Sequence, residues 1–142
     1  MKTFTRLALA MVLAGAIAAG TALATGTGRA AGTTVGVKVR EMRIIPARLK
    51  VPAGRVTFQV RNVGTIDHEL VVIRANGRAA LPVHNYRAEE GRAVVGEADD
   101  VAPGHAKRVT LALTPGRYFL ICNIPGHYQL GMSALLRVVS GA

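Results

Sequence analysis

The stretch Tyr118-Phe-Leu-Ile-Cys-Asn-Ile-Pro-Gly-His-Tyr-Gln-Leu-Gly-Met132 brings three metal-binding residue types together in one short segment. Four residues separate Cys122, the only cysteine of the chain, from His127, and four more separate His127 from Met132. A thiolate, an imidazole and a thioether are soft and borderline ligands, and together they suit copper better than the other common metals. The spacing therefore predicts a copper site on a loop.

The segments on both sides of this loop have the alternation of β-strands. Before the loop, Tyr118, Leu120 and Cys122 share one face of a strand. After it, alternate residues from Met132 to Val138 share one face. A proline and two glycines inside the loop allow a tight turn. We therefore expect the ligands to lie at one end of a β core, where two antiparallel strands meet.

The rest of the chain also reads as short strands separated by turns. Glycine, proline and asparagine turn signals recur every eight to twelve residues, and no long amphipathic helix is present. Residues 79–91 are irregular and could hold a helical turn. The predicted strands are 35–40, 48–51, 56–60, 68–74, 93–96, 107–113, 117–122 and 137–139. This pattern predicts an all-β fold, an antiparallel Greek-key sandwich or barrel of seven to eight strands.

The N-terminal residues predict export. Lys2 and Arg6 precede an Ala/Leu-rich stretch that ends in Ala22-Leu-Ala24, a small-x-small cleavage site, so residues 1–24 are predicted to be a signal peptide. A retained membrane anchor is the alternative, because the stretch is nearly long enough to span a bilayer. Residues 25–34 are then a flexible leader, and residues 35–142 are one domain in the periplasm or outside the cell.

Charge and cysteine content narrow the functions. An exported lone cysteine cannot form an internal disulfide, and a nearby His and Met favour metal binding over pairing with another chain. The formal net charge is +10, spread along the sequence. It favours partners with acidic surfaces or association with a membrane surface, unless it only reflects an arginine-rich proteome. No basic run with interleaved aromatic residues is present, so nucleic acid is not an expected partner.

A type 1 copper site needs two histidines, one cysteine and a weak axial methionine, so one histidine must come from elsewhere in the chain. Three candidates exist. His68 opens a predicted strand and shares a face with Leu70, whereas His84 lies in an irregular segment and His105 follows a Pro-Gly turn. We therefore choose His68 as the fourth ligand.

These residues resemble those of a known family. Asn62, Gly64 and His68, followed by Cys122-Asn-Ile-Pro-Gly-His127 and Gly131-Met132, are similar to the cupredoxins, the type 1 blue copper proteins. The loop spacing is most similar to that of rusticyanin and sulfocyanin-like proteins.

The resemblance implies a cupredoxin-like sandwich that holds one copper ion and transfers single electrons. His68, Cys122 and His127 would be equatorial metal ligands and Met132 the axial one. The resemblance also implies that the protein is no enzyme, that its partners are redox proteins and that it is a monomer. The edge of His127, ringed by Ile124, Pro125 and Leu130, would be the electron port.

One residue departs from the family pattern. Many blue copper proteins have Asn or Ser directly after the first His, where it braces the loop that carries the Cys, but here that residue is Glu69. A carboxylate near the copper would lower the reduction potential, whereas strand alternation would point it away from the metal. We expect the hydrogen-bond donor to the Cys122 sulfur to lie in residues 62–67 or in the Pro125-Gly126 turn.

Three classes of function compete. The first is an electron carrier that cycles between Cu(I) and Cu(II). The second is a periplasmic copper carrier, or an atypical cupredoxin without an electron-transfer role. The third is an enzyme with Cys122 as nucleophile, which leaves Met132 unexplained. Each residue could also be an ordinary core or turn residue, but their combined spacing favours copper. Zinc fits less well, because a thioether is a poor ligand for it.

Overall fold

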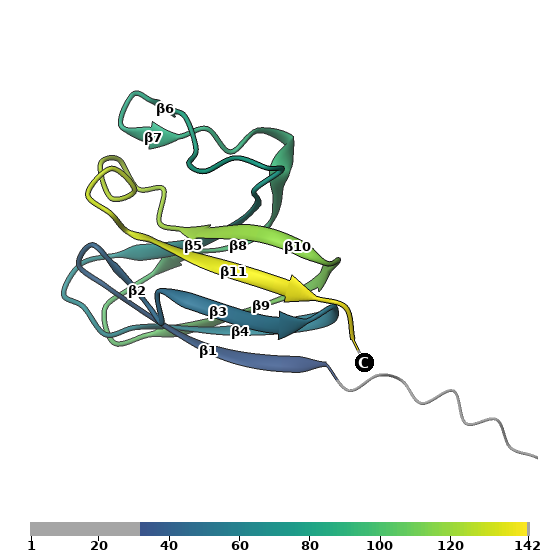
Figure 1. Cartoon of the computed structure of the whole chain (residues 1–142). Helices are drawn as coiled ribbons and strands as arrows, with labels where there is room; N and C mark the ends of the chain where they lie inside the picture. Colours follow the sequence, from purple (N-terminus) through teal and green to yellow (C-terminus); the bar gives the residue numbers. More distant parts are fainter. Residues whose placement is uncertain (1–31, 142) are drawn as a thin grey trace, which may run out of the picture.

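The computed structural model describes residues 32–141 (Figure 1), so the predicted signal peptide and most of the predicted leader lie outside the described residues. No helix in the described range is long and apolar enough to cross a membrane. In chain order the elements are β1 (Thr33–Arg40), β2 (Arg43–Ile45), β3 (Arg48–Pro52), β4 (Gly54–Asn62), β5 (His68–Arg74), β6 (Val83–His84), β7 (Arg87–Ala88), the 3-10 helix η1 (Gly91–Ala93), β8 (Val94–Val101), β9 (Ala106–Leu113), β10 (Gly116–Ile121) and β11 (Ser133–Val139).

Two sheets pack face to face around one main core. Sheet A has the strand order β2-β1-β4-β9, and sheet B has the order β3-β11-β10-β5-β8. The alternation predicted for β4 is confirmed, because Val56, Phe58 and Val60 are fully buried between exposed or half-buried neighbours. Tyr118 and Leu120 of β10 meet them from the opposite sheet in the same core. The predicted sandwich of two β-sheets is therefore confirmed.

Two details of the predicted sandwich differ from the structure. Eight strands of five residues or more are present, as expected, but β2, β6 and β7 raise the number to eleven in the described range. The all-antiparallel arrangement is wrong, because β1 pairs with β4 and β3 with β11 in parallel. Both parallel pairs arise because the chain crosses from sheet A to sheet B between Ile45 and Arg48 and then returns for β4.

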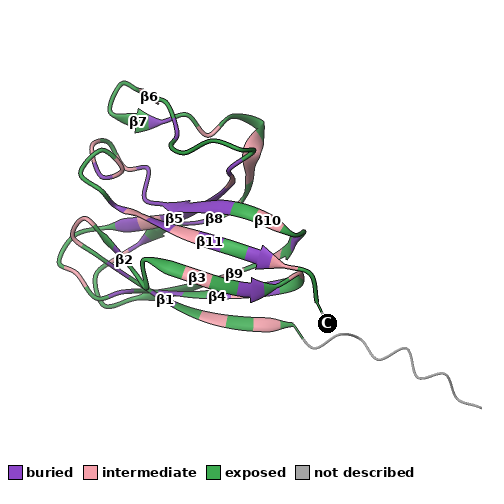
Figure 2. Cartoon of the chain, viewed as in Figure 1, coloured by how far each residue is buried: buried purple, intermediate pink, exposed green. Residues whose placement is uncertain are grey.

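A second, smaller core covers part of the outer face of sheet B. Val71, Ile73, Phe119 and Ile121 point away from the main core and pack under the segment between β5 and β8. Figure 1 shows this segment, with the β6–β7 hairpin, lying above the sheet, and Figure 2 shows β5 and β10 as the most continuously buried strands. The irregular segment predicted for residues 79–91 is thus a lid on sheet B. The 3-10 helix η1 begins only at the last residue of that segment, Gly91.

The loop between β4 and β5 ends at His68 and is held by side chains on both sides. The Asn62 amide donates to the carbonyl groups of Ile66 and Val101, each at 2.7 Å. The Glu41 carboxylate accepts the backbone N–H of Thr65 and its hydroxyl group. These bonds hold the pKa of Glu41 down at about 2.

Gly64 makes room for this carboxylate. A Cβ atom at Gly64 would lie 2.6 Å from Oε1 of Glu41, closer than real Cβ contacts allow. A larger side chain at position 64 would therefore displace the Glu41 carboxylate from Thr65.

Glu41→Gln tests this brace through the pH dependence of stability. The folded pKa of Glu41, about 2, lies below the ordinary value of 4.5, so the ionised carboxylate stabilises the folded state. That contribution is fully present above pH 4.5 and is lost as the pH falls toward 2. We expect the urea midpoint of Glu41→Gln to lie below that of the parent protein at pH 7, and the difference to vanish in acid. Glu97→Gln, which removes an exposed carboxylate outside the loop, is the control. A difference that does not change with pH would contradict the brace.

Candidate metal centre

Strand pairing brings the two distant parts of the site together. His68 is the first residue of β5, and Cys122 directly follows β10. The two strands are antiparallel neighbours, with Ile121 opposite Val71. The start of β5 therefore lies beside the end of β10, and His68 reaches the Cys122 loop although it is 54 residues away in sequence.

Three donor atoms converge at this end of the sandwich. The Cys122 Sγ atom lies 3.2 Å from Nδ1 of His127 and 4.0 Å from Nδ1 of His68. One ligand atom from each of the three residues lies within 4.8 Å of the other two, and the centroids of the two imidazole rings are 5.2 Å apart. Metal–sulfur and metal–nitrogen bonds of about 2.3 and 2.0 Å at 120° imply a sulfur–nitrogen distance of about 3.7 Å. The observed distances lie on both sides of this value, so the donors fit one metal ion.

Burial leaves these donors with few partners except one another. Cys122 and His68 are fully buried and His127 is 8% exposed. Burial raises the pKa of the Cys122 thiol and lowers the pKa of both histidines. Neutral imidazoles keep the lone pairs that a metal ion requires. His68 Nε2 is the only buried side-chain N or O atom in residues 32–141 without a hydrogen-bond partner. The Nδ1 atom of the same His68 ring faces the Cys122 sulfur. One sulfur and two neutral nitrogen atoms that face one another suit a soft cation such as copper.

Met132 closes the same loop. Its side chain is fully buried in the main core beside Cys122. Its carbonyl accepts the N–H of Cys122 at 3.2 Å, and its N–H donates to the carbonyl of His127 at 3.0 Å. Gly126 and Gly131 have φ values of 85° and 93°, which glycine adopts without steric cost. All four predicted residues thus lie at one end of the sandwich, and the axial role of Met132 stays a prediction.

The other two histidines lie away from this cluster. His84 is in β6, is mostly exposed and contacts Glu89 at 2.9 Å. His105 is exposed, and its Nδ1 lies 3.0 Å from the carbonyl oxygen of Pro103. The choice of His68 among the three candidates therefore agrees with the geometry.

Glu69 takes up the position where the β5–β10 ladder ends. Its backbone N–H donates to the Cys122 Sγ atom at 3.5 Å, and its carboxylate accepts the N–H of Asn123 at 2.7 Å. The prediction that the sulfur donor lies in residues 62–67 or in the Pro125-Gly126 turn is wrong, because the donor is the N–H of Glu69, the second residue of β5. The carboxylate braces the loop in the way expected of Asn or Ser in the family. Burial raises its pKa, and the Asn123 N–H opposes that effect.

Asn123 links the loop to the lid on sheet B, a role that the sequence prediction missed. Its amide oxygen accepts the N–H of Ala88 at 2.6 Å, and its Nδ2 donates to the Ala88 carbonyl at 3.0 Å and to Glu90 at 2.6 Å. Arg87 donates to the Asn123 carbonyl at 2.9 Å. A polar residue directly after a buried cysteine was the available signal. This network fixes the backbone that carries Cys122.

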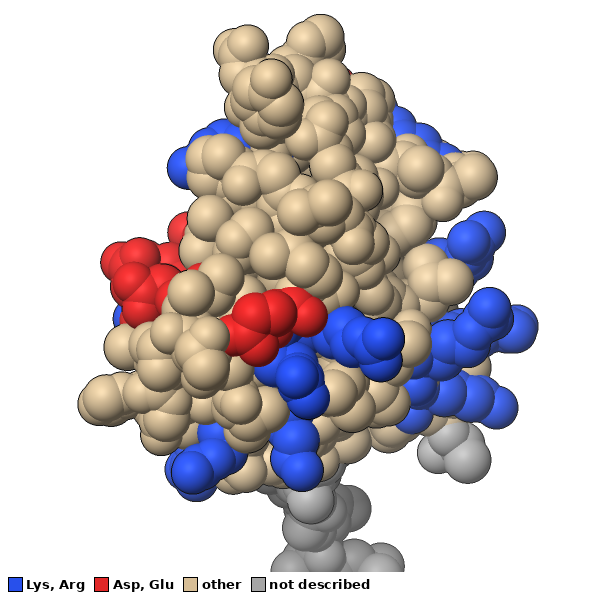
Figure 3. Space-filling model, turned by 90° about the vertical axis from the view of Figure 1, so that its left-hand side faces the viewer, with Lys and Arg blue, Asp and Glu red and all other residues tan. Residues whose placement is uncertain are grey.

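The surface near the site has little charge. Figure 3 faces the end of the molecule where the loops gather, and most of its upper and central area is free of charged side chains. Leu130 of the ligand loop is 67% exposed, and Ile66 of the β4–β5 loop is 43% exposed. His127, with 8% exposure, is the least buried of the three donors. The surface around the least buried donor is therefore mainly uncharged.

Comparisons with known proteins agree with this geometry. The sequence model of the cupredoxin-like domain family matches residues 7–132. Auracyanin of Roseiflexus castenholzii aligns with a TM-score of 0.62 and 22% identity, covering 75% of this chain and 97% of that protein. Auracyanin A of Chloroflexus aurantiacus, described as a "blue" copper protein, aligns with a TM-score of 0.61 and 25% identity, covering 77% of this chain and 100% of that protein. Rusticyanin of Thiobacillus ferrooxidans aligns with a TM-score of 0.57 and 20% identity, covering 77% of this chain and 79% of that protein.

A longer curated protein also matches part of this chain. The iron uptake system component EfeO of Yersinia pseudotuberculosis is 29% identical over 90 residues, which cover 63% of this chain and 20% of that protein. EfeO of Yersinia pestis matches to the same extent. The chain thus spans about a fifth of the length of the curated relatives that it matches.

Asn123→Ala tests the link between the ligand loop and the lid. The substitution leaves the buried N–H and C=O groups of Ala88 without partners, which costs about 1–3 kcal/mol per group. We expect the free energy of unfolding of the metal-free protein to fall by at least about 1 kcal/mol in urea. Gln59→Ala, at an exposed position of β4, should change it by less than about 0.5 kcal/mol. Equal effects of the two substitutions would show that the network adds no stability.

Proposed function

The chain belongs to the cupredoxin-like domain family, and on this premise we propose that it is an exported type 1 copper protein that carries single electrons between redox partners. The observation that carries the proposal is the convergence of Cys122 Sγ with the Nδ1 atoms of His127 and His68, at 3.2 and 4.0 Å. One buried thiolate with two imidazoles is the equatorial donor set of blue copper sites. Met132 would be the axial donor.

The protein residues would hold one copper ion and limit its rearrangement. Bound copper would supply the one-electron oxidation and reduction. Cu(I) favours sulfur donors and Cu(II) favours imidazole nitrogen, so a site with both kinds of donor changes little between the two states. The loop is fixed by the Cys122 N–H to Met132 bond and by the Glu69 carboxylate on Asn123. Because the loop is rigid, the donors would move little when the copper ion gains or loses an electron.

His127 is the proposed port for electrons. It is the donor nearest to solvent, and the exposed Leu130 and Pro125 lie beside it in the ligand loop. A mainly uncharged surface at this end of the molecule would let a partner come close without desolvating charges (Figure 3). Export, the periplasmic or extracellular location and the monomeric state remain part of this proposal, supported by the sequence of residues 1–24 and by the single cysteine.

A copper carrier is the second candidate. The match to EfeO, an iron uptake system component, connects related domains with metal uptake. A carrier must exchange its metal, however, whereas the donors here are buried and fixed by backbone hydrogen bonds. This observation favours the electron carrier.

A cysteine-dependent enzyme has less support. The Cys122 Sγ lies beside His127 Nδ1, which such an enzyme would need. However, the sulfur is fully buried and the pKa of the thiol is raised by burial, whereas nucleophilic cysteines are accessible and have lowered pKa values. We therefore propose that the protein is not an enzyme.

The optical spectrum of the copper-loaded protein tests the proposal. One equivalent of Cu(II) should produce an intense blue or green colour from thiolate-to-copper charge transfer. The colour should bleach with mild reductant and return with oxidant. Cys122→Ser should lack this band, because it removes the thiolate from which the charge transfer arises. His68→Ala should shift the band, because it removes one equatorial nitrogen donor and keeps the sulfur. His105→Ala, which removes an exposed histidine outside the cluster, should keep it.

Two other outcomes would support the alternatives. A colourless Cu(II) form that loses its metal to a mild chelator within minutes would indicate a copper carrier. Catalytic activity that persists without metal and disappears on thiol alkylation would indicate an enzyme.

Met132→Leu tests the axial donor. The two side chains have similar volume, so the fold should remain. Loss of a weak donor to Cu(II) should keep the colour and raise the reduction potential by roughly 60 mV or more, a factor of about ten in a one-electron equilibrium. Met42→Leu, in the turn after β1, should leave the potential unchanged. An unchanged potential in Met132→Leu would mean that Met132 only fills the core.

A further inference from the structure

Three cations stand in a row across the outer face of sheet B. Lys50 of β3 pairs directly with Arg137 of β11, and Arg137 pairs directly with Arg117 of β10. Directly opposed like charges destabilise a sheet. All three side chains are exposed, and none of them makes an ion pair within residues 32–141. An anion bound beside these three side chains would reduce their mutual repulsion.

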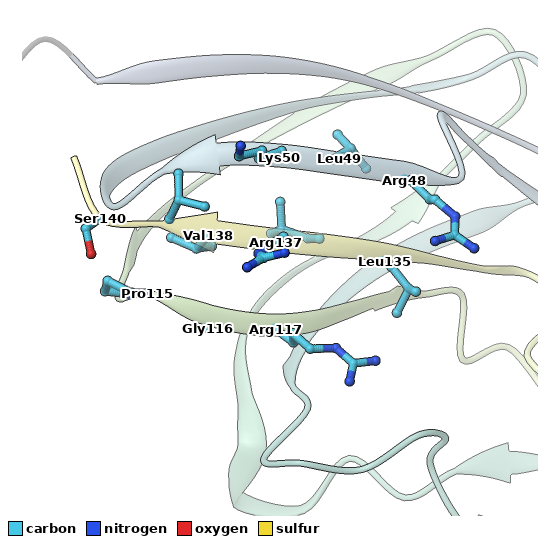
Figure 4. Close-up of a pocket in the computed structure, with 12 residues that line it drawn as sticks. Arg48, Leu49, Lys50, Pro115, Gly116, Arg117, Leu135, Arg137, Val138 and Ser140 are labelled. Carbon is cyan, nitrogen blue, oxygen red and sulfur yellow. The ribbon is translucent and has the colours of Figure 1, made fainter. Parts of the chain in front are cut away.

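The row lies in a groove of about 910 Å³. Figure 4 shows Arg48 and Lys50 on β3, Arg137 on β11 and Arg117 on β10, with Leu135 and Val138 also on β11. The eight Asp and Glu residues of the sequence all lie outside β3, β10 and β11, and none lines the groove. Exposed cations thus lie beside half-buried apolar side chains such as Leu135.

The position of the groove follows from the lid on sheet B. The lid covers the half of the outer face near the metal centre, where Phe119 and Ile121 are buried beneath it. The half that carries Arg117 and Arg137 is left uncovered. Arg117 lies five residues before Cys122, which corresponds to about 17 Å along the strand. An occupant of the groove would leave the surface near His127 free.

We propose that this groove binds an extended acidic segment of a partner protein. Arg48 and Lys50 are two residues apart on one face of β3, a distance of about 6.6 Å. Carboxylates at alternate positions of an extended peptide have the same spacing. Arginine side chains also bind carboxylates through paired hydrogen bonds. The segment would hold the carrier beside its partner, and this docking does not depend on copper chemistry at the other end.

The shape of the surface favours a peptide over an anionic membrane. A groove that lies over three hydrogen-bonded strands accepts a narrow chain, whereas a flat bilayer meets the outermost cations first. Sheet A offers the comparison, because its outer face also carries cations, among them Arg55 and Arg61, and neither residue lines this groove. If net charge alone attracted anions, the two sheets would bind them alike.

Fluorescence anisotropy with a labelled octapeptide of alternating Glu and Ser tests the proposal on the copper-loaded full-length protein. The peptide should bind, and affinity should fall when salt is raised from about 50 to about 500 mM. Arg117→Gln/Arg137→Gln should weaken binding about tenfold or more. Arg55→Gln/Arg61→Gln, with the same change of net charge on sheet A, should have little effect. A peptide of alternating Gln and Ser should not bind.

Other results would overturn the proposal. Equal losses in the two double variants would show that binding follows net charge. Binding to phosphatidylglycerol vesicles without binding of the peptide would assign the surface to a membrane. The variants also have a readout without any ligand: Arg137→Gln should raise the thermal midpoint, because it relieves two opposed cation pairs. A lowered midpoint would mean that the row is not repulsive, and the argument for a bound anion would fail.

Discussion

The antiparallel pairing of β5 with β10 is the constraint on which the rest of the structure depends. It sets Ile121 opposite Val71 and so brings the first residue of β5 beside the residue that follows β10. The backbone hydrogen bonds between the two strands end at that point. Glu69 makes two other bonds there: its N–H donates to the Cys122 sulfur, and its carboxylate accepts the N–H of Asn123. The register of two strands thereby determines which donor atoms meet.

Burying these donors has an energetic cost that the surrounding fold must offset. Unpaired polar groups in an apolar core are unfavourable, and here a thiol and two imidazoles face mainly one another. The two cores on the faces of sheet B supply the packing that holds them in place. A cation between the donors would convert this unfavourable arrangement into a binding site, which joins the stability of the fold to its proposed redox function.

Much of this could be predicted from the sequence, because the signals were local. Alternation predicted β4, and the spacing of Cys122, His127 and Met132 placed them in one loop. The parallel pairing of β1 with β4 could not be predicted, since it depends on which sheet the chain enters after Ile45. A polar residue after a buried cysteine singled out Asn123, but its partner Ala88 could not be predicted, because the two residues are 35 apart and Ala88 lies in a segment without periodic pattern. The row of Lys50, Arg137 and Arg117 exists only once the strand register is known.

X-ray absorption at the copper edge tests the central claim most directly, since it counts the donors around the ion in solution. The protein loaded with one equivalent of copper should show one short bond to sulfur and two to imidazole nitrogen, at about 2.0–2.3 Å. His68→Ala should lose one nitrogen donor and keep the sulfur. A shell of oxygen and nitrogen atoms without a short sulfur bond would contradict the account, because it would place the ion away from Cys122.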